Sequence, residues 1–145
     1  NIIINTKNPG KYRHIKTSSL EELLKKSDII TLNLPLNNET KHLIDRDKIN
    51  LMKREVLLIN CARGPVVNEK DIITALKEKR IKGAAFDVFE KEPLPKESEL
   101  FDLENIILTP HTAFYTEEAM ERLKDICMKN IISFLKGKPV NVVNV

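Results

Sequence analysis

Short apolar runs alternate with amphipathic segments along this chain of 145 residues. The apolar runs end in turn-forming residues and predict strands at residues 1–4, 28–34, 57–62, 83–89 and 106–109. Apolar positions at helical spacing predict helices over 45–52 and 68–79, one that begins at Ser18 or Ser19, and a long one between Thr116 and Gly137. This alternation predicts an α/β fold with a partial, doubly wound parallel sheet and a long C-terminal helix.

The central strand is the apolar run at 57–62, which stops abruptly at Arg63, Gly64 and Pro65. Its hydrophobic residues alternate little with polar ones, which is typical of a strand buried on both faces of a sheet. In open α/β sheets, ligands bind at the carboxyl ends of the strands. Arg63 is therefore placed where it could meet a substrate anion. The simpler interpretation is that Arg63 pairs with a neighbouring carboxylate and only closes the strand.

Composition narrows the class of protein. Hydrophobic residues make up 41% of the chain and charged residues 31%, which is ordinary for a globular domain. The net charge is only +3, and the lysines are scattered among glutamates, so neither a nucleic acid nor a membrane surface is expected as a partner. No run resembles a membrane span or a signal peptide, and we expect a cytoplasmic protein. Cys61 and Cys127 lack the spacing of a metal site or a disulfide framework and are expected to be free thiols.

Three neighbouring strand ends carry groups suited to acid-base chemistry. Arg63 follows one strand, Asp87 and Glu92 follow the next, and His111 follows the last. A carboxylate bonded to a histidine fixes one tautomer and stabilises the protonated ring, and arginine offers a planar fork for a carboxylate. Taken singly, Glu92 could be a solvated loop residue, Asp87 a turn cap and His111 a partner of the backbone. At one sheet edge, together they favour a catalytic site.

These segments carry a family resemblance. Residues 60–67, 83–94 and 108–111 resemble, in order and spacing, the signatures of the D-isomer-specific 2-hydroxyacid dehydrogenases. The segment 34–44 resembles that family's loop beside the cofactor ribose. The resemblance implies a Rossmann-like domain and an enzyme that transfers a hydride between NAD(P)H and a small 2-oxo acid to give a D-2-hydroxy acid.

The resemblance also implies roles for single residues. Arg63 would bind the carboxylate and carbonyl of the substrate, His111 would protonate the carbonyl oxygen, Glu92 would hold His111, and Asp87 would bond the nicotinamide carboxamide. The implied cofactor-binding set, for NAD or NADP, is Asn5, Thr6, Lys7, Leu34, Pro35, Thr40, Cys61, Ala62, Arg63, Asp87 and His111. No metal site is expected.

The loop after the first strand bears on the choice of dinucleotide. NAD enzymes usually place a carboxylate there against the ribose hydroxyls. Here the loop reads Asn5, Thr6, Lys7, Asn8, with no carboxylate to repel a 2′-phosphate. Lys7 and Thr6 could receive that phosphate, and so NADPH is expected to be used at least as well as NADH. The alternative is that Lys7 points into solvent and selects nothing.

The chain departs from the family pattern in one respect. Its glycines stand at 10, 64, 83 and 137, so the glycine-rich turn that cradles the pyrophosphate is missing. We therefore expect residues 1–113 to be the C-terminal part of a dinucleotide-binding domain without its first βα unit. Residues 114–145 would be a helix and tail returning to an absent substrate domain. The apolar stripe of that helix would pack outside this sequence, through Met120, Leu123, Cys127, Ile131 and Leu135.

On this interpretation the full-length protein is expected to be a homodimer, and the isolated chain to bind cofactor weakly and to be inactive. A non-enzymatic alternative is an NAD(P)-sensing protein similar to a corepressor, with the same fold. Thiol catalysis by Cys61 with His111 is a third class. It is disfavoured because a cysteine at a strand end is more often inert packing.

Overall fold

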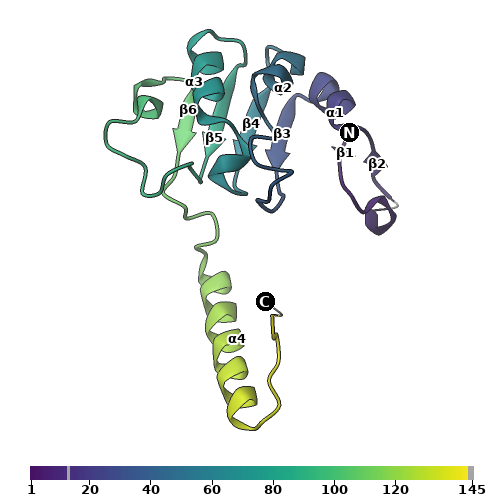
Figure 1. Cartoon of the computed structure of the whole chain (residues 1–145), viewed down its shortest axis with the longest axis vertical. Helices are drawn as coiled ribbons and strands as arrows, with labels where there is room; N and C mark the ends of the chain where they lie inside the picture. The colour runs from purple at the N-terminus through teal and green to yellow at the C-terminus, as the bar shows by residue number, and fades with distance from the viewer. Residues whose placement is uncertain (13, 144–145) are drawn as a thin grey trace. The chain divides into compact units, whose positions relative to one another are not determined.

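The computed structural model describes residues 1–12 and 14–143 (Figure 1). It divides into two compact units, Asn1–His111 and Thr112–Val145. In the described part of the chain, no helix is both long enough and apolar enough to cross a membrane.

The first unit is built on a parallel sheet of four strands. These are β3 (Ile29–Leu32), β4 (Leu57–Asn60), β5 (Gly83–Phe86) and β6 (Ile106–Leu108), and they pair in that order. The helix α2 (Arg46–Leu51) joins β3 to β4, and α3 (Glu69–Lys77) joins β4 to β5. Because right-handed crossovers between successive neighbours return on the same side, α2 and α3 cover one face (Figure 1). The predicted parallel α/β fold is confirmed.

Local sequence explains where these helices begin. Asp45 caps α2, since its carboxylate accepts a hydrogen bond from the Lys48 N–H at 2.9 Å. The side chain of Asn68 caps α3 in the same way, through the N–H of Asp71 at 3.3 Å. The inner faces of the helices then pack on the sheet, and the side chains that are completely buried include Ile49, Leu58, Ile72, Leu76, Ile81 and Leu100.

The amino-terminal segment forms a separate, smaller sheet. Strand β1 (Ile3–Ile4) pairs in parallel with β2 (Lys16–Thr17), a 3₁₀ turn spans Pro9–Tyr12, and α1 (Leu20–Lys26) follows. Ser19 caps α1 as predicted, by accepting the Glu22 N–H at 3.2 Å. The sequence did not predict β2, since its two residues are polar and exposed. A hollow of about 260 Å³ lies between β1 and β3 and is lined mostly by apolar side chains.

The expectation that the central strand is buried on both faces is wrong. Burial alternates along β4, with Leu58 and Asn60 fully buried and Leu57 39% exposed. Ile29 and Ile107 are exposed on neighbouring strands by 61% and 67%. In the described chain, helices cover one face of the sheet. Apolar side chains on the opposite face remain exposed.

The second unit contains α4 (Glu117–Leu135). Thr116 caps it by accepting the Ala119 N–H at 3.1 Å, and Gly137 follows its end with a positive φ of 69°, as the sequence predicted. No residue of α4 is buried. Leu123, Ile131 and Leu135 of its predicted apolar stripe are each exposed by half or more.

Candidate active site

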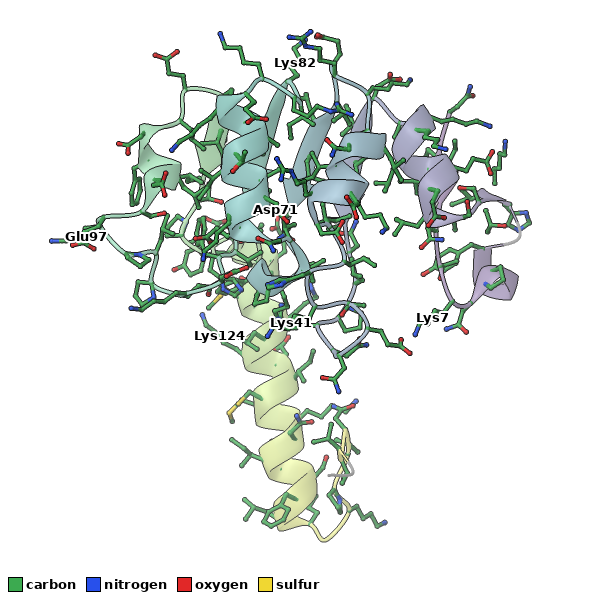
Figure 2. The ribbon with its side chains drawn as sticks, turned by 45° about the horizontal axis from the view of Figure 1, so that its top comes forward. Lys7, Lys41, Asp71, Lys82, Glu97 and Lys124 are labelled. Carbon is green, nitrogen blue, oxygen red and sulfur yellow. The ribbon has the colours of Figure 1, made fainter. Side chains whose placement is uncertain are left out.

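The ends of β4, β5 and β6 lie side by side, as the sequence predicted. Hydrogen bonds extend the pairing just beyond the strands, from the Asp87 N–H to the Asn60 carbonyl and from the Thr109 N–H to the Phe86 carbonyl, both at 3.0 Å. Figure 2 shows the two ends of this sheet, with Lys82 just before β5 at one end and Lys41 in the loop after β3 at the other. The candidate residues follow the strands and therefore gather at the Lys41 end.

His111 and Glu92 form a close pair at this edge. The Nδ1 of His111 lies 2.6 Å from Oε2 of Glu92, and the other oxygen of Glu92 accepts the Phe89 N–H at 3.0 Å. Burial raises the pKa of Glu92, but the bonds from His111 and Phe89 lower it by more, so the net shift is below the ordinary value. Glu92 is thus an exposed loop residue whose carboxylate contacts the ring of His111.

The backbone at His111 is strained. Its φ is +55°, a left-handed conformation that costs a residue with a side chain about 1 kcal/mol or more. Its N–H donates to the Thr109 carbonyl at 3.0 Å, which closes a tight turn after β6. Such strain persists where the surrounding structure fixes it, and it often marks functional residues.

A cleft of about 690 Å³ opens beside this pair. Its walls are mostly apolar, and Glu92, Thr109 and His111 supply the polar side chains. The apolar lining consists of Phe89, Pro93, Leu94, Phe101, Leu108 and Pro110. An apolar cavity with a few convergent polar groups is the usual form of a small-molecule site.

Asp87 lies under this edge and is only 3% exposed. The hydroxyl of Thr109 donates to its Oδ1 at 2.5 Å, a contact that joins the ends of β5 and β6. The sequence did not single out Thr109 as a site residue. The available signal was its position: Thr109 carries a hydroxyl and directly precedes the proline and histidine that follow the last strand.

Arg63 occupies a different hollow. Its Nη1 donates to the Ala62 carbonyl at 2.7 Å, and, among the described residues, it forms no ion pair with a carboxylate. The predicted alternative, in which a neighbouring carboxylate neutralises Arg63, is therefore wrong. Arg63 lines a cleft of about 430 Å³ together with Asn33, Leu34, Pro35, Leu36, Cys61 and Ala62.

Asn60 shapes the turn that presents Arg63. Its side chain is fully buried, donates to the Arg63 carbonyl at 3.1 Å and accepts the Ala62 N–H at 3.1 Å. Asn60 was not predicted to have a role of its own, although a polar residue that ends an apolar strand was a visible signal. Cys61 is a free thiol, as predicted, and it is exposed. In the described chain no hydrogen bond joins it to a histidine.

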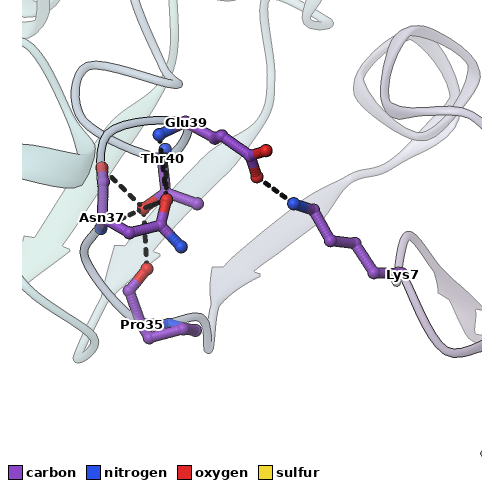
Figure 3. A network of polar contacts seen from close by, with 5 residues as sticks. All are labelled: Lys7, Pro35, Asn37, Glu39 and Thr40. Carbon is purple, nitrogen blue, oxygen red and sulfur yellow. Dashed lines mark hydrogen bonds and ion pairs between the residues drawn. The ribbon is translucent and has the colours of Figure 1, made fainter. Parts of the chain in front are cut away.

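The loops expected to meet the adenosine end of a dinucleotide contact each other through Lys7 and Glu39 (Figure 3). Their hydrogen bond lowers the pKa of the exposed Glu39 carboxyl. The loop after β1 has no carboxylate of its own, but Glu39 from the loop after β3 supplies one to Lys7. Both side chains remain largely exposed, by 76% for Lys7 and 67% for Glu39.

Other residues expected at the cofactor shape these same loops. The hydroxyl of Thr40 donates to the Pro35 carbonyl at 2.7 Å, and it also accepts the N–H of Asn37 at 2.8 Å (Figure 3). The Asn5 amide donates to the Ser18 carbonyl at 3.0 Å, and the Thr6 hydroxyl accepts the Asn8 N–H at 3.2 Å. Asn5, Thr6 and Leu34 also line the hollow between β1 and β3.

Comparison with known proteins gives a consistent assignment. Residues 2–113 match the model of the family described as "D-isomer specific 2-hydroxyacid dehydrogenase, NAD binding domain". A glyoxylate reductase from Thermofilum pendens is 45% identical over 132 residues, which cover 90% of this chain and 39% of the reductase.

Solved structures agree with this assignment. An acyclic imino acid reductase in complex with NADPH and D-Arg superposes with a TM-score of 0.90 at 36% identity, over 99% of this chain and 46% of that one. D-Lactate dehydrogenase from Aquifex aeolicus, complexed with NAD and lactic acid, gives 0.83 at 33% identity, over 94% and 46%. The chain thus spans less than half the length of each of these proteins.

Proposed function

The chain belongs to the family of D-isomer specific 2-hydroxyacid dehydrogenases, and on that premise we propose that it supplies the nicotinamide-binding and proton-transferring part of a 2-oxo acid reductase. The overall reaction adds a hydride to the carbonyl carbon of a small 2-oxo acid and a proton to its oxygen, which gives a D-2-hydroxy acid. NAD(P)H, when bound, supplies the hydride. The residues of this chain bind, orient and protonate.

The His111–Glu92 pair is the observation that carries the proposal. Because the Glu92 carboxylate lies 2.6 Å from Nδ1, the other ring nitrogen, Nε2, is left to meet a substrate. Protonated His111 donates its Nε2 proton to the carbonyl oxygen as negative charge develops there. Glu92 holds the ring and balances the positive charge of imidazolium before the transfer.

Arg63 is proposed to bind the substrate carboxylate. One of its Nη atoms is occupied by the Ala62 carbonyl, and in the described chain no carboxylate neutralises the guanidinium. An exposed cation at a strand end suits a small anionic substrate. The substrate would thus lie between Arg63 and His111, which come from different loops.

The donor set at the strand ends fits a nicotinamide dinucleotide. Asp87 offers a buried carboxylate as hydrogen-bond acceptor for a carboxamide, and the cleft formed by Leu34, Pro35, Cys61 and Ala62 offers a partly apolar wall for a planar ring or a ribose. Asn5, Thr6, Lys7 and Thr40 would stand near the adenosine end. NAD(P) binding by these residues is part of the proposal.

The finer features are also proposals. Lys7 can accept a 2′-phosphate by exchanging Glu39 for it, so we expect NADPH to be used at least as well as NADH. The full-length protein is proposed to be a cytoplasmic homodimer, and the free thiols Cys61 and Cys127 agree with a reducing compartment.

A spectrophotometric assay tests the function. The full-length protein should oxidise NADH or NADPH when it is given glyoxylate, hydroxypyruvate or pyruvate. Cofactor binding without turnover on any 2-oxo acid would contradict a reductase and support the alternative of an NAD(P)-sensing protein.

A further inference from the structure

A second histidine contacts a second carboxylate near the candidate active site. The Nε2 of His42 lies 2.9 Å from Oε1 of Glu90. That same oxygen accepts the Glu69 N–H at 3.2 Å, and the Glu69 carboxylate accepts the Glu90 N–H at 3.3 Å. Three segments therefore meet at Glu90: the loop after β3, the start of α3 and the loop after β5.

The backbone around Glu90 also touches the turn that carries Arg63. A Cβ placed on Gly64 would lie 1.9 Å from the carbonyl carbon and oxygen of Phe89 and 2.6 Å from the Glu90 nitrogen. Only a residue without a side chain permits so close an approach. The residue after Arg63 thus packs on the backbone that precedes Glu92.

His42 holds the other side of the same turn. Its N–H donates to the Pro65 carbonyl at 2.7 Å, and its φ of +51° is a left-handed value that few residues with a side chain adopt. The Gly64–Pro65 turn therefore lies between His42 and the Phe89–Glu90 backbone. The Phe89 N–H in turn holds Glu92, which contacts His111.

We propose that Glu90 is a positioning residue. Held by His42 and by the Glu69 N–H, it fixes the 89–92 segment against the Arg63 turn and so sets the separation of Arg63 from the Glu92–His111 pair. No direct polar contact joins Arg63 to that pair in the described chain, so their geometry depends on this packing. The inference rests on the proposed function, in which Arg63 and His111 act on one substrate.

Kinetics of the full-length protein test the role. Glu90→Ala should lower kcat with 2-oxo acids by about tenfold to a hundredfold, because small misplacements of catalytic groups are costly, while the KM for cofactor stays within about twofold. Glu90→Gln keeps an oxygen for the Glu69 N–H and should recover most of the loss. Wild-type kcat in Glu90→Ala, or a loss confined to cofactor KM, would overturn the proposal.

Two further variants guard against misfolding and nonspecific effects. His42→Ala removes the contact from the opposite side and should also lower kcat, and wild-type kcat in this variant would count against the proposal. Glu97→Ala is the matched control, since Glu97 is an exposed carboxylate of the loop after β5 that points away from the ribbon (Figure 2). Its kinetics should match those of the unaltered protein.

A spectroscopic measurement separates this inference from the proposed function. In full-length protein with ¹⁵N-labelled histidine, the Nδ1 signal of His111 should move in Glu90→Ala and stay unchanged in Glu97→Ala. If the unaltered protein reduces no 2-oxo acid, the proposed function fails, and this signal still reports whether Glu90 positions the pair. An unmoved signal in Glu90→Ala would refute the positioning role.

Discussion

Nδ1 of His111 and Oε2 of Glu92 lie 2.6 Å apart although the two residues are 19 positions apart in the chain. The contact joins the loop after β5 to the turn after β6, and the left-handed backbone of His111 holds the ring at the cleft. In the proposed reaction this relationship determines which ring nitrogen is left for the substrate, and the first two predictions follow from it.

Replacing His111 by glutamine in the full-length protein should lower turnover by about a hundredfold to ten-thousandfold, because the general acid is lost. The dissociation constant of NAD(P)H should change little, since the proton donor acts on the substrate oxygen. Steady-state kinetics and fluorescence titration measure the two quantities. His14→Gln is the matched control, and equal losses of turnover and cofactor affinity in His111→Gln would remove His111 from this role.

Replacing Glu92 by glutamine should lower the free energy of unfolding in a pH-dependent way. The pKa of this carboxyl lies below its ordinary value of 4.5 in the folded chain. A carboxyl whose pKa falls on folding adds stability above its unfolded pKa, and that stability is lost as the pH falls through the folded pKa. Urea titrations should therefore show a difference near neutral pH that shrinks below pH 4.5. A difference independent of pH would contradict this account.

Replacing Glu39 by glutamine should raise the ratio of kcat/KM for NADPH to that for NADH. The substitution removes the carboxylate that occupies Lys7, and with it a charge that would repel a 2′-phosphate. Thr6→Asp combined with Lys7→Ala should shift the ratio in the opposite direction. A strong preference for NADH that none of these substitutions changes would show that these loops do not select the cofactor.

Replacing Gly64 by alanine should destabilise the chain by about 1–3 kcal/mol or more, because the added methyl group would overlap the Phe89 carbonyl. Gly10→Ala is the matched control. A Cβ at Gly10 would have no neighbour within 4 Å, and its stability should stay close to that of the wild type. Thermal or urea unfolding compares the two variants, and equal stability would argue against the close approach at Gly64.

The sequence predicted most of the elements because their signals are local. Ser19, Asp45, Asn68 and Thr116 all cap the helices that they were expected to begin, and the apolar runs mark β3 to β6. From local signals we also predicted that Arg63, Asp87 and His111 lie at neighbouring strand ends. β2 was missed because its pairing with β1 depends on a partner 13 positions away in register and not on any apolar pattern of its own.

Contacts between distant loops could not be predicted in the same way. Two such contacts are Lys7 with Glu39 and His42 with Glu90. Each involves single charged or polar residues in loops, and the sequence around each residue does not indicate its partner. The apolar run at 57–62 also could not reveal that only one face of β4 is covered, because exposure depends on what packs above a strand. The clefts also could not be predicted from the sequence. Arg63 and His111 line two different clefts.

The absence of buried side chains along the 19 residues of α4 has a consequence for amide exchange. With no side chain fully buried, this helix is stabilised mainly by its own backbone hydrogen bonds and caps, whereas most helical stability in proteins comes from packing. Its amide protons should exchange with deuterium through frequent local opening, whereas those of β4 should exchange only when the sheet itself opens. Deuterium uptake by peptides from 117–135 should therefore be far faster than by peptides from 57–60.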